Sequence, residues 1–211
     1  EARGRITHGD VGLWSDDHVV GLAEIAAIVA GYGAVPAIQI GHAGRKASSQ
    51  RPWGGNLALT EADEAARGDA PWQTVAPSAI PYMDGWHTPA ELSDDEITGL
   101  VDAFAAAARR AVKAGFKAVE IHGAHGYLIH TFLSPKSNRR NDRWGGDLRG
   151  RMAFPLAVAE AMRAALPDDL PLFFRTSSVD GDEGVWSIED TVILARELKA
   201  RGVDVMDCST S

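Results

Sequence analysis

The sequence predicts an α/β fold, and within that class the central part of a (β/α)8 TIM barrel. Short apolar runs alternate with amphipathic helical segments along the chain, which is typical of parallel βα units. The links from helix to strand are short, whereas the three visible loops from strand to helix are much longer, which indicates that one edge of the sheet is built for function. No GxGxxG motif follows a strand, which argues against a dinucleotide-binding doubly wound sheet and favours the barrel.

Composition narrows the class of protein further. The 211 residues are 45% hydrophobic with a net charge of −8, as expected of a single globular domain over residues 1–211. The basic residues are scattered, so nucleic acid is not an expected partner. The single cysteine, Cys208, cannot form an internal disulfide, which fits a cytoplasmic location. Because no apolar run approaches about 18 residues and no signal peptide opens the chain, we expect no membrane insertion.

The first helix and the first strand are expected before residue 41. Ser15 is a suitable N-cap for the helix, and Gly31 and Gly33 are suited to end it. A strand is expected over 34–40, with Pro36 near its beginning, where a missing N–H is tolerated. The apolar positions with helical spacing in this first helix are Leu22, Ile25, Ala26 and Val29.

The same alternation continues through the rest of the chain. Ser93 and Glu96 form a capping-box sequence at the start of a second helix, and Gly115 is expected to end it. Ser187 is a suitable cap for the last helix. The other expected elements are a strand over 118–122, a helix over 148–165, a strand over 171–176, a helix over 188–201 and a strand over 203–207.

Four strands are too few to close an eight-stranded barrel, and they leave two sheet edges with unpaired backbone groups. The chain also begins at Glu1 without a methionine and reaches Ser211 just after a strand. We therefore expect it to contain about four central βα units of a longer protein.

The densest group of reactive side chains follows the expected strand 118–122. His122 and His125 have an i, i+3 spacing, which in a helical turn lets both imidazoles donate hydrogen bonds to one substrate oxygen. Tyr127 follows closely and can donate a proton from its hydroxyl. For the two histidines, structural hydrogen bonding and metal binding are the alternatives. No HExxH motif is present and Glu120 is expected on the other side of the strand, so we favour substrate binding and expect no metal.

Polar residues also end the neighbouring strands. Gln39 offers an amide donor and acceptor that suit the edge of a planar heterocycle, with loop stabilisation as the alternative. Arg175 would need an anionic or electron-rich partner if buried, and the ring edge of a reduced flavin would supply one. The polar residues that end the fourth strand are Asp207, Ser209 and Thr210.

Three other groups have more than one interpretation. The basic cluster of His42, Arg45 and Lys46 either binds a substrate or cofactor phosphate or forms a solvated rim. The segment 138–146, NRRNDRWGG, is interpreted as structural because its side chains are polar, favour turns and can bind backbone carbonyls. The aromatic residues of the long first loop, interpreted as packing with a lid or an interface as the alternative, are Trp53, Trp72, Tyr82 and Trp86.

Four segments, in order along the chain, closely resemble the Old Yellow Enzyme family of FMN-dependent ene-reductases. They are IQIGHAGRK at 38–46, EIHGAHGYLIHTFLSPKSNRRNDRWGG at 120–146, FRTSSVDGDEGVW at 174–186 and DVMDCSTS at 204–211. GRITHGDVGLWSDDH near the start and HAGRKASSQRPWGG are similar to the bacterial class that includes xenobiotic reductases. The resemblance covers almost the whole chain.

The resemblance implies FMN at the carboxyl mouth of the barrel, reduced by NADPH or NADH and reoxidised by a small activated alkene. It implies that Gln39 and Arg175 contact the flavin ring. It also implies that His122 and His125 bind the carbonyl or nitro oxygen of the substrate while hydride reaches the β carbon, and that Tyr127 protonates the α carbon. Members of the family commonly form dimers or tetramers, so a homo-oligomer is expected.

Two departures from the family's pattern carry expectations of their own. Gly150 precedes Arg151 where the family usually has an Asn-Arg pair, which weakens the helix start by up to about 1 kcal/mol. The family's first barrel strand and its last two strands, which carry the FMN phosphate site, have no counterpart in these residues. We therefore expect the 211 residues alone not to hold FMN tightly.

Three alternative functions stay open. A dienoyl-CoA reductase-type enzyme shares the barrel but adds an iron–sulfur cluster, which needs several cysteines. A metal-dependent barrel hydrolase would use His122, His125 and Asp207. A non-catalytic fragment would bind a partner through its open strand edges.

Overall fold

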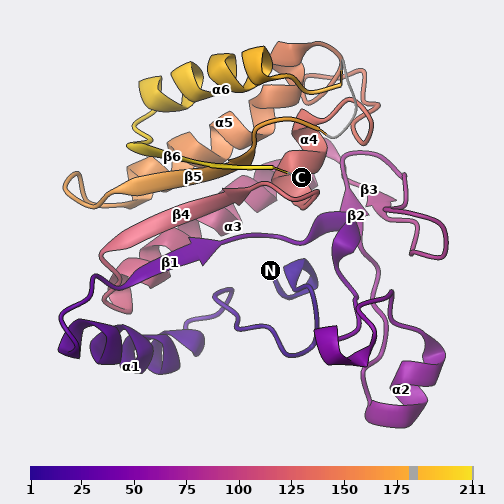
Figure 1. Cartoon of the computed structure of the whole chain (residues 1–211), viewed down its shortest axis with the longest axis horizontal. Coiled ribbons are helices and arrows are strands. Elements are labelled where there is room, and N and C mark those ends of the chain that lie inside the picture. The colour runs from indigo at the N-terminus through magenta and orange to yellow at the C-terminus, as the bar shows by residue number, and fades with distance from the viewer. Residues whose placement is uncertain (181–184, 211) are drawn as a thin grey trace.

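A four-stranded parallel sheet forms the centre of the computed structural model, which describes residues 1–180 and 185–210 (Figure 1). The strand order is β1-β4-β5-β6, and a second, two-stranded sheet pairs β2 with β3. The strands and α-helices are α1 (His18–Gly31), β1 (Ala37–Ile40), α2 (Glu61–Arg67), β2 (Val75–Ala76), β3 (Ala90–Glu91), α3 (Asp94–Lys113), β4 (Ala118–Gly123), α4 (Leu128–Leu133), α5 (Leu148–Ala165), β5 (Leu172–Ser177), α6 (Ile188–Ala200) and β6 (Val205–Ser209).

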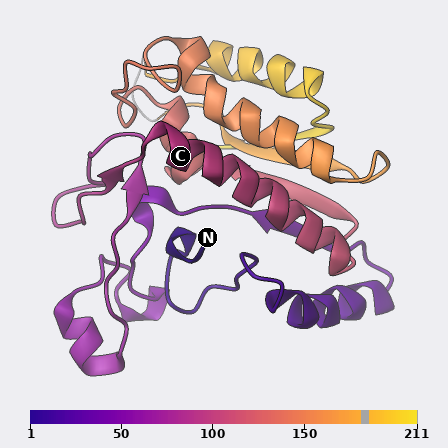
Figure 2. The same ribbon diagram turned by 180° about the vertical axis from the view of Figure 1, so that it is seen from behind.

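Each pair of neighbouring strands in the main sheet is joined through a helix. The crossover helices are α3 between β1 and β4, α5 between β4 and β5, and α6 between β5 and β6. Figure 2 shows these three helices side by side over one face of the sheet. Consecutive parallel strands with helices on one face are the arrangement of successive units of a (β/α)8 barrel, so the predicted α/β architecture is confirmed.

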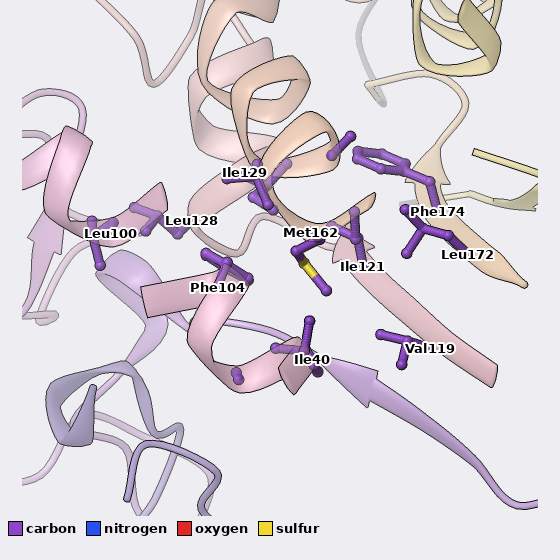
Figure 3. Packing of buried hydrophobic residues seen from close by; sticks show 14 of the residues in the cluster. Ile40, Leu100, Phe104, Val119, Ile121, Leu128, Ile129, Met162, Leu172 and Phe174 are labelled. Atoms are coloured by element: carbon purple, nitrogen blue, oxygen red, sulfur yellow. The ribbon is translucent and has the colours of Figure 1, made fainter. Parts of the chain in front are cut away.

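The hydrophobic core lies between the sheet and the crossover helices. Figure 3 shows Ile40, Ile121 and Phe174, from three neighbouring strands, near Phe104 of α3 and Met162 of α5. All five side chains are buried. Side chains alternate along a strand, so the residues between these core positions point to the other face of the sheet. That face lies away from α3, α5 and α6. We call it the open face, and it carries Gln39, Glu120, His122, Arg175 and Asp207.

The long connections lie beyond the carboxyl ends of the strands, where Figure 1 shows α4 close to β2 and β3. Their position was predicted, but the elements inside them were not. The loop after β1 contains α2, β2 and β3, and the loop after β4 contains α4. All six residues of α4 are buried, so this short helix has no exposed side to give it an amphipathic pattern in the sequence.

The start of α1 differs from the expectation. The helix begins at His18 after Asp17, and the Ser15 hydroxyl donates to the Asp17 carboxylate at 3.0 Å instead of capping the helix. Ile25 is 48% exposed, so the predicted apolar face was partly wrong. The face that packs on the core is formed by Val19, Leu22 and Ala26.

The other predicted helix starts are confirmed. Ser93 and Ser187 each accept a hydrogen bond from the backbone N–H three residues later, and both caps are capping boxes. Gly115 follows the end of α3 with φ +93°, a conformation that suits glycine. None of the helices in the described parts of the chain combines the length and the apolar character that crossing a bilayer requires.

Gly150 has a low helix propensity but is needed for close packing at the start of α5. The Asp147 carboxylate caps α5 by accepting from the Gly150 N–H at 2.8 Å. A Cβ atom at position 150 would overlap the carbonyl oxygen of Gly145. Glycine therefore allows the loop and the helix to approach closely, which offsets the loss of propensity.

Candidate active site

Three rings meet at the carboxyl end of β4. The ring centroid of His122, near the end of the strand, is 5.1 Å from that of His125 and 5.1 Å from that of Tyr127. His122 also lies opposite Arg175 in the register of β4 and β5. The structure thus brings together the three residues predicted to meet a substrate and places them next to a strand that carries one of the predicted cofactor contacts.

The backbone of His125 is in the left-handed region, with φ +60°. The expected helical turn was therefore wrong, because His122 belongs to a strand and His125 to a tight turn. Such a conformation is strained for a residue with a Cβ, and strain of this kind gathers at functional sites. Three contacts fix the residue: its N–H donates to Ser177 Oγ at 2.9 Å, its carbonyl accepts from Lys46 Nζ at 2.7 Å, and its Nε2 lies 2.9 Å from Ser209 Oγ.

The rings at this site are neutral near pH 7. Burial, together with the neighbouring His125 and Arg175, lowers the pKa of His122 to about 4. Burial also lowers the pKa of His125 and raises the pKa of the Tyr127 phenol. Each neutral imidazole keeps one N–H donor, and the phenol keeps its proton. The buried Nδ1 atom of His122 has no hydrogen-bond partner in the described parts of the protein, so it is available to a ligand.

Gln39 and Glu120 form a hydrogen bond on the open face. The Gln39 amide nitrogen donates to the Glu120 carboxylate at 2.5 Å, and the two residues are opposite each other in the register of β1 and β4. Glu120 therefore shares a face with His122. The expectation that it points to the other side was wrong, because residues two apart in a strand share a face. Gln39 uses one amide hydrogen here, so its oxygen and second hydrogen can serve a ligand.

Arg175 is only partly neutralised by its surroundings. Its Nε atom lies 3.4 Å from the Asp207 carboxylate, which is its register partner in β6. The same Nε atom is buried and has no partner with hydrogen-bond geometry in the described structure. A buried donor without an acceptor is costly, so this guanidinium is suited to an added anionic or electron-rich group.

A cavity of about 510 Å³ adjoins this site. It lies between the N-terminal segment, β1 and parts of α1 and α3, and it reaches Gln39, His122 and Tyr127. Apolar groups such as Trp14 and Ile38 form much of the remaining wall. A pocket of this size with apolar walls and a few convergent polar groups is typical of small-molecule and cofactor sites.

The predicted basic cluster divides into two parts. His42 is buried and structural: its Nδ1 accepts from the Gly44 N–H at 3.0 Å, so its Nε2 carries the proton that bonds to Glu1 at 2.9 Å. Burial lowers the pKa of His42, in agreement with a neutral ring. Arg45 and Lys46 instead line a second cavity beside His125.

The segment 138–146 makes the structural contacts that the sequence suggested. The Asn138 amide donates to the carbonyls of Phe132 and Trp144, both at 2.8 Å. The buried Arg140 guanidinium donates to the carbonyls of Pro77 at 3.0 Å and Leu92 at 2.6 Å. These bonds hold the loop between α4 and α5 against the first long loop.

Sequence reasoning missed the residues that support the turn at His125. His130 accepts from the Gly126 N–H through Nδ1 at 2.7 Å, so its Nε2–H donates to Asp180 at 2.8 Å. The Ser134 hydroxyl donates to the same carboxylate at 2.5 Å. Asp180 carries no pattern that links it to α4, because its partners His130 and Ser134 lie 50 and 46 residues earlier in the sequence. Positions 181–184 and 211 of the motifs noted above lie outside the described residues.

The alternative of a metal centre is not supported by these contacts. Within the described ranges, no group of three or more histidine, cysteine, aspartate or glutamate side chains is placed to hold a metal ion. His125 instead contacts Ser209, and Asp207 lies against Arg175.

The chain forms half of a barrel, and polar groups converge at the carboxyl ends of its strands. This arrangement is that of the (β/α)8-barrel enzymes. The family model for the NADH:flavin oxidoreductase / NADH oxidase family matches residues 1–211, and the chain belongs to that family. An NADPH dehydrogenase of Geobacillus sp. (strain WCH70) is 42% identical over 209 residues, which are 99% of this chain and 55% of that relative. The chain thus spans about half the length of the curated relatives it matches.

Solved structures agree with this assignment. A 2-naphthoyl-CoA reductase in complex with 2-naphthoyl-CoA is similar with a TM-score of 0.83 and 29% identity, over 99% of this chain and 31% of that one. An old yellow enzyme homologue from Zymomonas mobilis gives a TM-score of 0.74 and 28% identity, over 93% of this chain and 54% of that one. Both the predicted family and the predicted partial barrel are confirmed.

Proposed function

We propose that the intact protein is an FMN-dependent ene-reductase that uses NADPH or NADH to reduce small activated alkenes, such as enones and nitroalkenes. The observation that carries the proposal is the meeting of His122, His125 and Tyr127 beside the open face, with neutral donors and a buried, unpartnered His122 nitrogen. Family membership supports the flavin and nicotinamide parts of the proposal. In the same proposal, residues 1–211 are part of one flavin-binding barrel domain in a homo-oligomeric cytoplasmic protein.

The residues of the open face fit a flavin. The unpartnered Nε of Arg175 offers positive charge to an electron-rich ring edge, and Gln39 has an amide oxygen and hydrogen to spare. When bound, the flavin would supply to the substrate the hydride that it receives from the nicotinamide cofactor. In this proposal Gln39 and Arg175 hold the ring, and Arg175 also stabilises negative charge on it.

His122 and His125 polarise the substrate. In this proposal His125 Nε2 accepts from the Ser209 hydroxyl, so its Nδ1–H is the donor to the substrate. Two N–H donors that meet at one carbonyl or nitro oxygen withdraw electron density from the conjugated alkene and make its β carbon electrophilic. The same donors stabilise the negative charge that develops on the oxygen. Because Ser177, Lys46 and Ser209 fix His125 in advance, little reorganisation is needed when that charge appears.

Tyr127 completes the reaction by protonating the α carbon. Burial raises its pKa, so the phenol carries its proton at neutral pH. The Lys46 ammonium lies 5.7 Å from the centroid of the Tyr127 ring, where its charge stabilises the phenolate left after proton transfer.

The similarity to 2-naphthoyl-CoA reductase supports a second candidate, a reductase for CoA thioesters of the dienoyl-CoA reductase type. In that case the same histidines would bind the thioester oxygen. The iron and sulfide content of the intact protein separates the two candidates, since the second requires an iron–sulfur cluster.

The main test is anaerobic reduction of the intact protein by NADPH and by NADH, followed by reoxidation with 2-cyclohexenone. We expect the visible flavin band to bleach with a nicotinamide and to return with the enone. Failure of both half-reactions would contradict the ene-reductase assignment.

A separate titration tests the expectation about the isolated 211 residues. We expect FMN to bind them weakly and the intact protein to bind it tightly. Submicromolar binding of FMN by the 211-residue chain, with a stoichiometric yellow colour, would refute this expectation.

A further inference from the structure

A second cavity, of about 330 Å³, is lined by His125, whereas His122 and Tyr127 line the first. Its walls come from the long loop after β1, from the turn before α4, from α4 and the segment that follows it, and from the chain just after β5 and β6. The mechanism proposed above makes no use of this space. The residues that matter for its chemistry are Arg45, Lys46, Tyr82, His125, Ser134 and Asp180.

Arg45 is an under-satisfied cation in this cavity. Its Nε atom is buried and has no hydrogen-bond partner in the described structure. Its Nη1 atom donates to the carbonyls of Ile80 at 3.4 Å and Pro81 at 3.2 Å, at or beyond the long end of the usual range. Burial lowers the pKa of Arg45, although the neighbouring Tyr82 and Asp180 oppose this shift. A guanidinium in this state is suited to an oxyanion, which it can bind through two parallel hydrogen bonds.

Lys46 adds a second positive charge. Its ammonium donates to the His125 carbonyl at 2.7 Å and lies 4.2 Å from the centroid of the Tyr82 ring. Neither contact is with an anion, so two of its three hydrogens remain for a ligand. Burial, followed by repulsion from Arg45, lowers the pKa of Lys46. The two cations therefore destabilise each other when no anion lies between them.

The carboxylate in the cavity wall is already engaged. Asp180 accepts from His130 at 2.8 Å and from Ser134 at 2.5 Å. Burial opposes its ionisation, but these hydrogen bonds outweigh burial and lower its pKa, so it is charged. It forms no ion pair with Arg45 or Lys46 in the described parts of the chain. Among the described cations of the wall, which also include Lys136, Arg45 and Lys46 thus lack a direct ion pair.

We propose that this cavity, which we call the anion pocket, binds a carboxylate or phosphate group through Arg45 and Lys46. Because His125, which is proposed to bind the substrate oxygen, also lines this pocket, the anion belongs to a molecule that also occupies the active site. The source is either an activated alkene with an acidic substituent or the phosphate-bearing part of the nicotinamide reductant. This choice of source rests on the proposed ene-reductase function, whereas the anion site itself does not.

The anion site is tested without turnover. Inorganic phosphate is titrated into the intact, flavin-loaded protein and binding is followed by calorimetry. We expect Arg45→Gln to weaken binding about tenfold, as for the loss of a charge-assisted hydrogen bond. Arg45→Lys keeps the charge but loses the planar fork, so its affinity should be intermediate. The matched control is Arg109→Gln, an exposed arginine of α3, which should bind phosphate as the wild type does.

Two pairs of reactants then identify the source of the anion. The first pair is trans-β-acetylacrylate and its methyl ester, which differ by one charge on the same enone. The second is NADPH and a benzyl dihydronicotinamide without phosphate. If the alkene carries the anion, Arg45→Gln lowers the acid-to-ester ratio of kcat/KM by about tenfold. If the reductant carries it, the same variant lowers the ratio between the two nicotinamides instead.

The proposal is overturned if folded Arg45→Gln protein, with an unchanged thermal midpoint, binds phosphate as tightly as the wild type. It is also overturned if both reactant ratios are unchanged in that variant. Phosphate binding that depends on Arg45 in a protein that reduces no alkene would reject the ene-reductase function and leave the anion site standing.

Discussion

The two faces of the main sheet are built from alternate residues of the same strands, yet their chemistry is opposite. On the face covered by helices, Ile121 and Phe174 are fully buried in the core. On the open face, Glu120 and Arg175, their immediate neighbours in sequence, are polar and only partly buried. The covered face stabilises the fold, and the open face leaves polar groups for a ligand.

The distribution of unsatisfied polar atoms supports this division. The buried nitrogens of His122 and Arg175 that lack hydrogen-bond partners both belong to the open face. On the covered face, the core between strands and helices is built from apolar side chains. Buried polar groups without partners are costly to a fold, so their position indicates where a ligand completes the structure.

The largest effect is expected from a matched pair of substitutions in β5. Phe174→Ala should destabilise the protein by about 3–5 kcal/mol, because it removes a fully buried ring from the core. Phe173→Ala, on the open face and only half-buried, should cost about 1 kcal/mol. Urea unfolding of both variants measures the difference. Equal losses would show that the two faces contribute equally to stability.

Arg175→Leu should act on the cofactor more than on the fold. Without the positive charge near the ring, the reduced and more negative flavin is less stable, and its midpoint potential should fall by roughly 30 mV. Arg109→Leu, on the outer surface of α3, is the control of equal charge change and should leave the potential where it is. If Arg175→Leu leaves the midpoint potential of the flavin unchanged, this residue does not contact the cofactor. Spectroelectrochemistry of the intact protein gives the values.

The last prediction is a pH dependence of stability. The pKa of His122 is about 4 in the folded protein, against 6.5 as its ordinary value, because burial disfavours the charged ring. As the pH falls from about 6.5 towards 4, the unfolded chain takes up a proton that the folded chain does not. Stability should therefore fall by about 3 kcal/mol over this window, because each pKa unit corresponds to about 1.4 kcal/mol. His122→Gln should flatten the dependence, and an unchanged slope would contradict the assigned pKa.

Much of the fold could be predicted because each βα unit repeats local signals. The capping boxes at Ser93 and Ser187 and the apolar strands of 118–122 and 171–176 need only their own neighbours in sequence to be recognised. The helix α4 was missed because it is buried on all sides, which removes the amphipathic pattern. The two-residue strands β2 and β3 were missed because they are too short to alternate.

The candidate site was predicted in its members but not in its geometry. The order of the parallel strands is enough to place three of these residues at adjacent strand ends, namely His122, Gln39 and Arg175. The left-handed turn at His125 depends on Ser177 and Lys46, which come from other strand ends. No local pattern in the sequence encodes such contacts. The position of Glu120, in contrast, followed from the two-residue period of a strand and was open to correct prediction.

The central claim is that His122 and His125 bind the substrate oxygen and do not hold the flavin. The direct measurement is the pair of dissociation constants for 2-cyclohexenone and for FMN in the intact His122→Ala protein. The control is Ile121→Val, the preceding residue on the covered face. We predict that His122→Ala weakens enone binding by about tenfold or more, as for a lost buried hydrogen bond, while FMN affinity changes little. The account would be contradicted if His122→Ala left the affinity for the enone unchanged, or if it lowered the affinity for FMN as much as that for the enone.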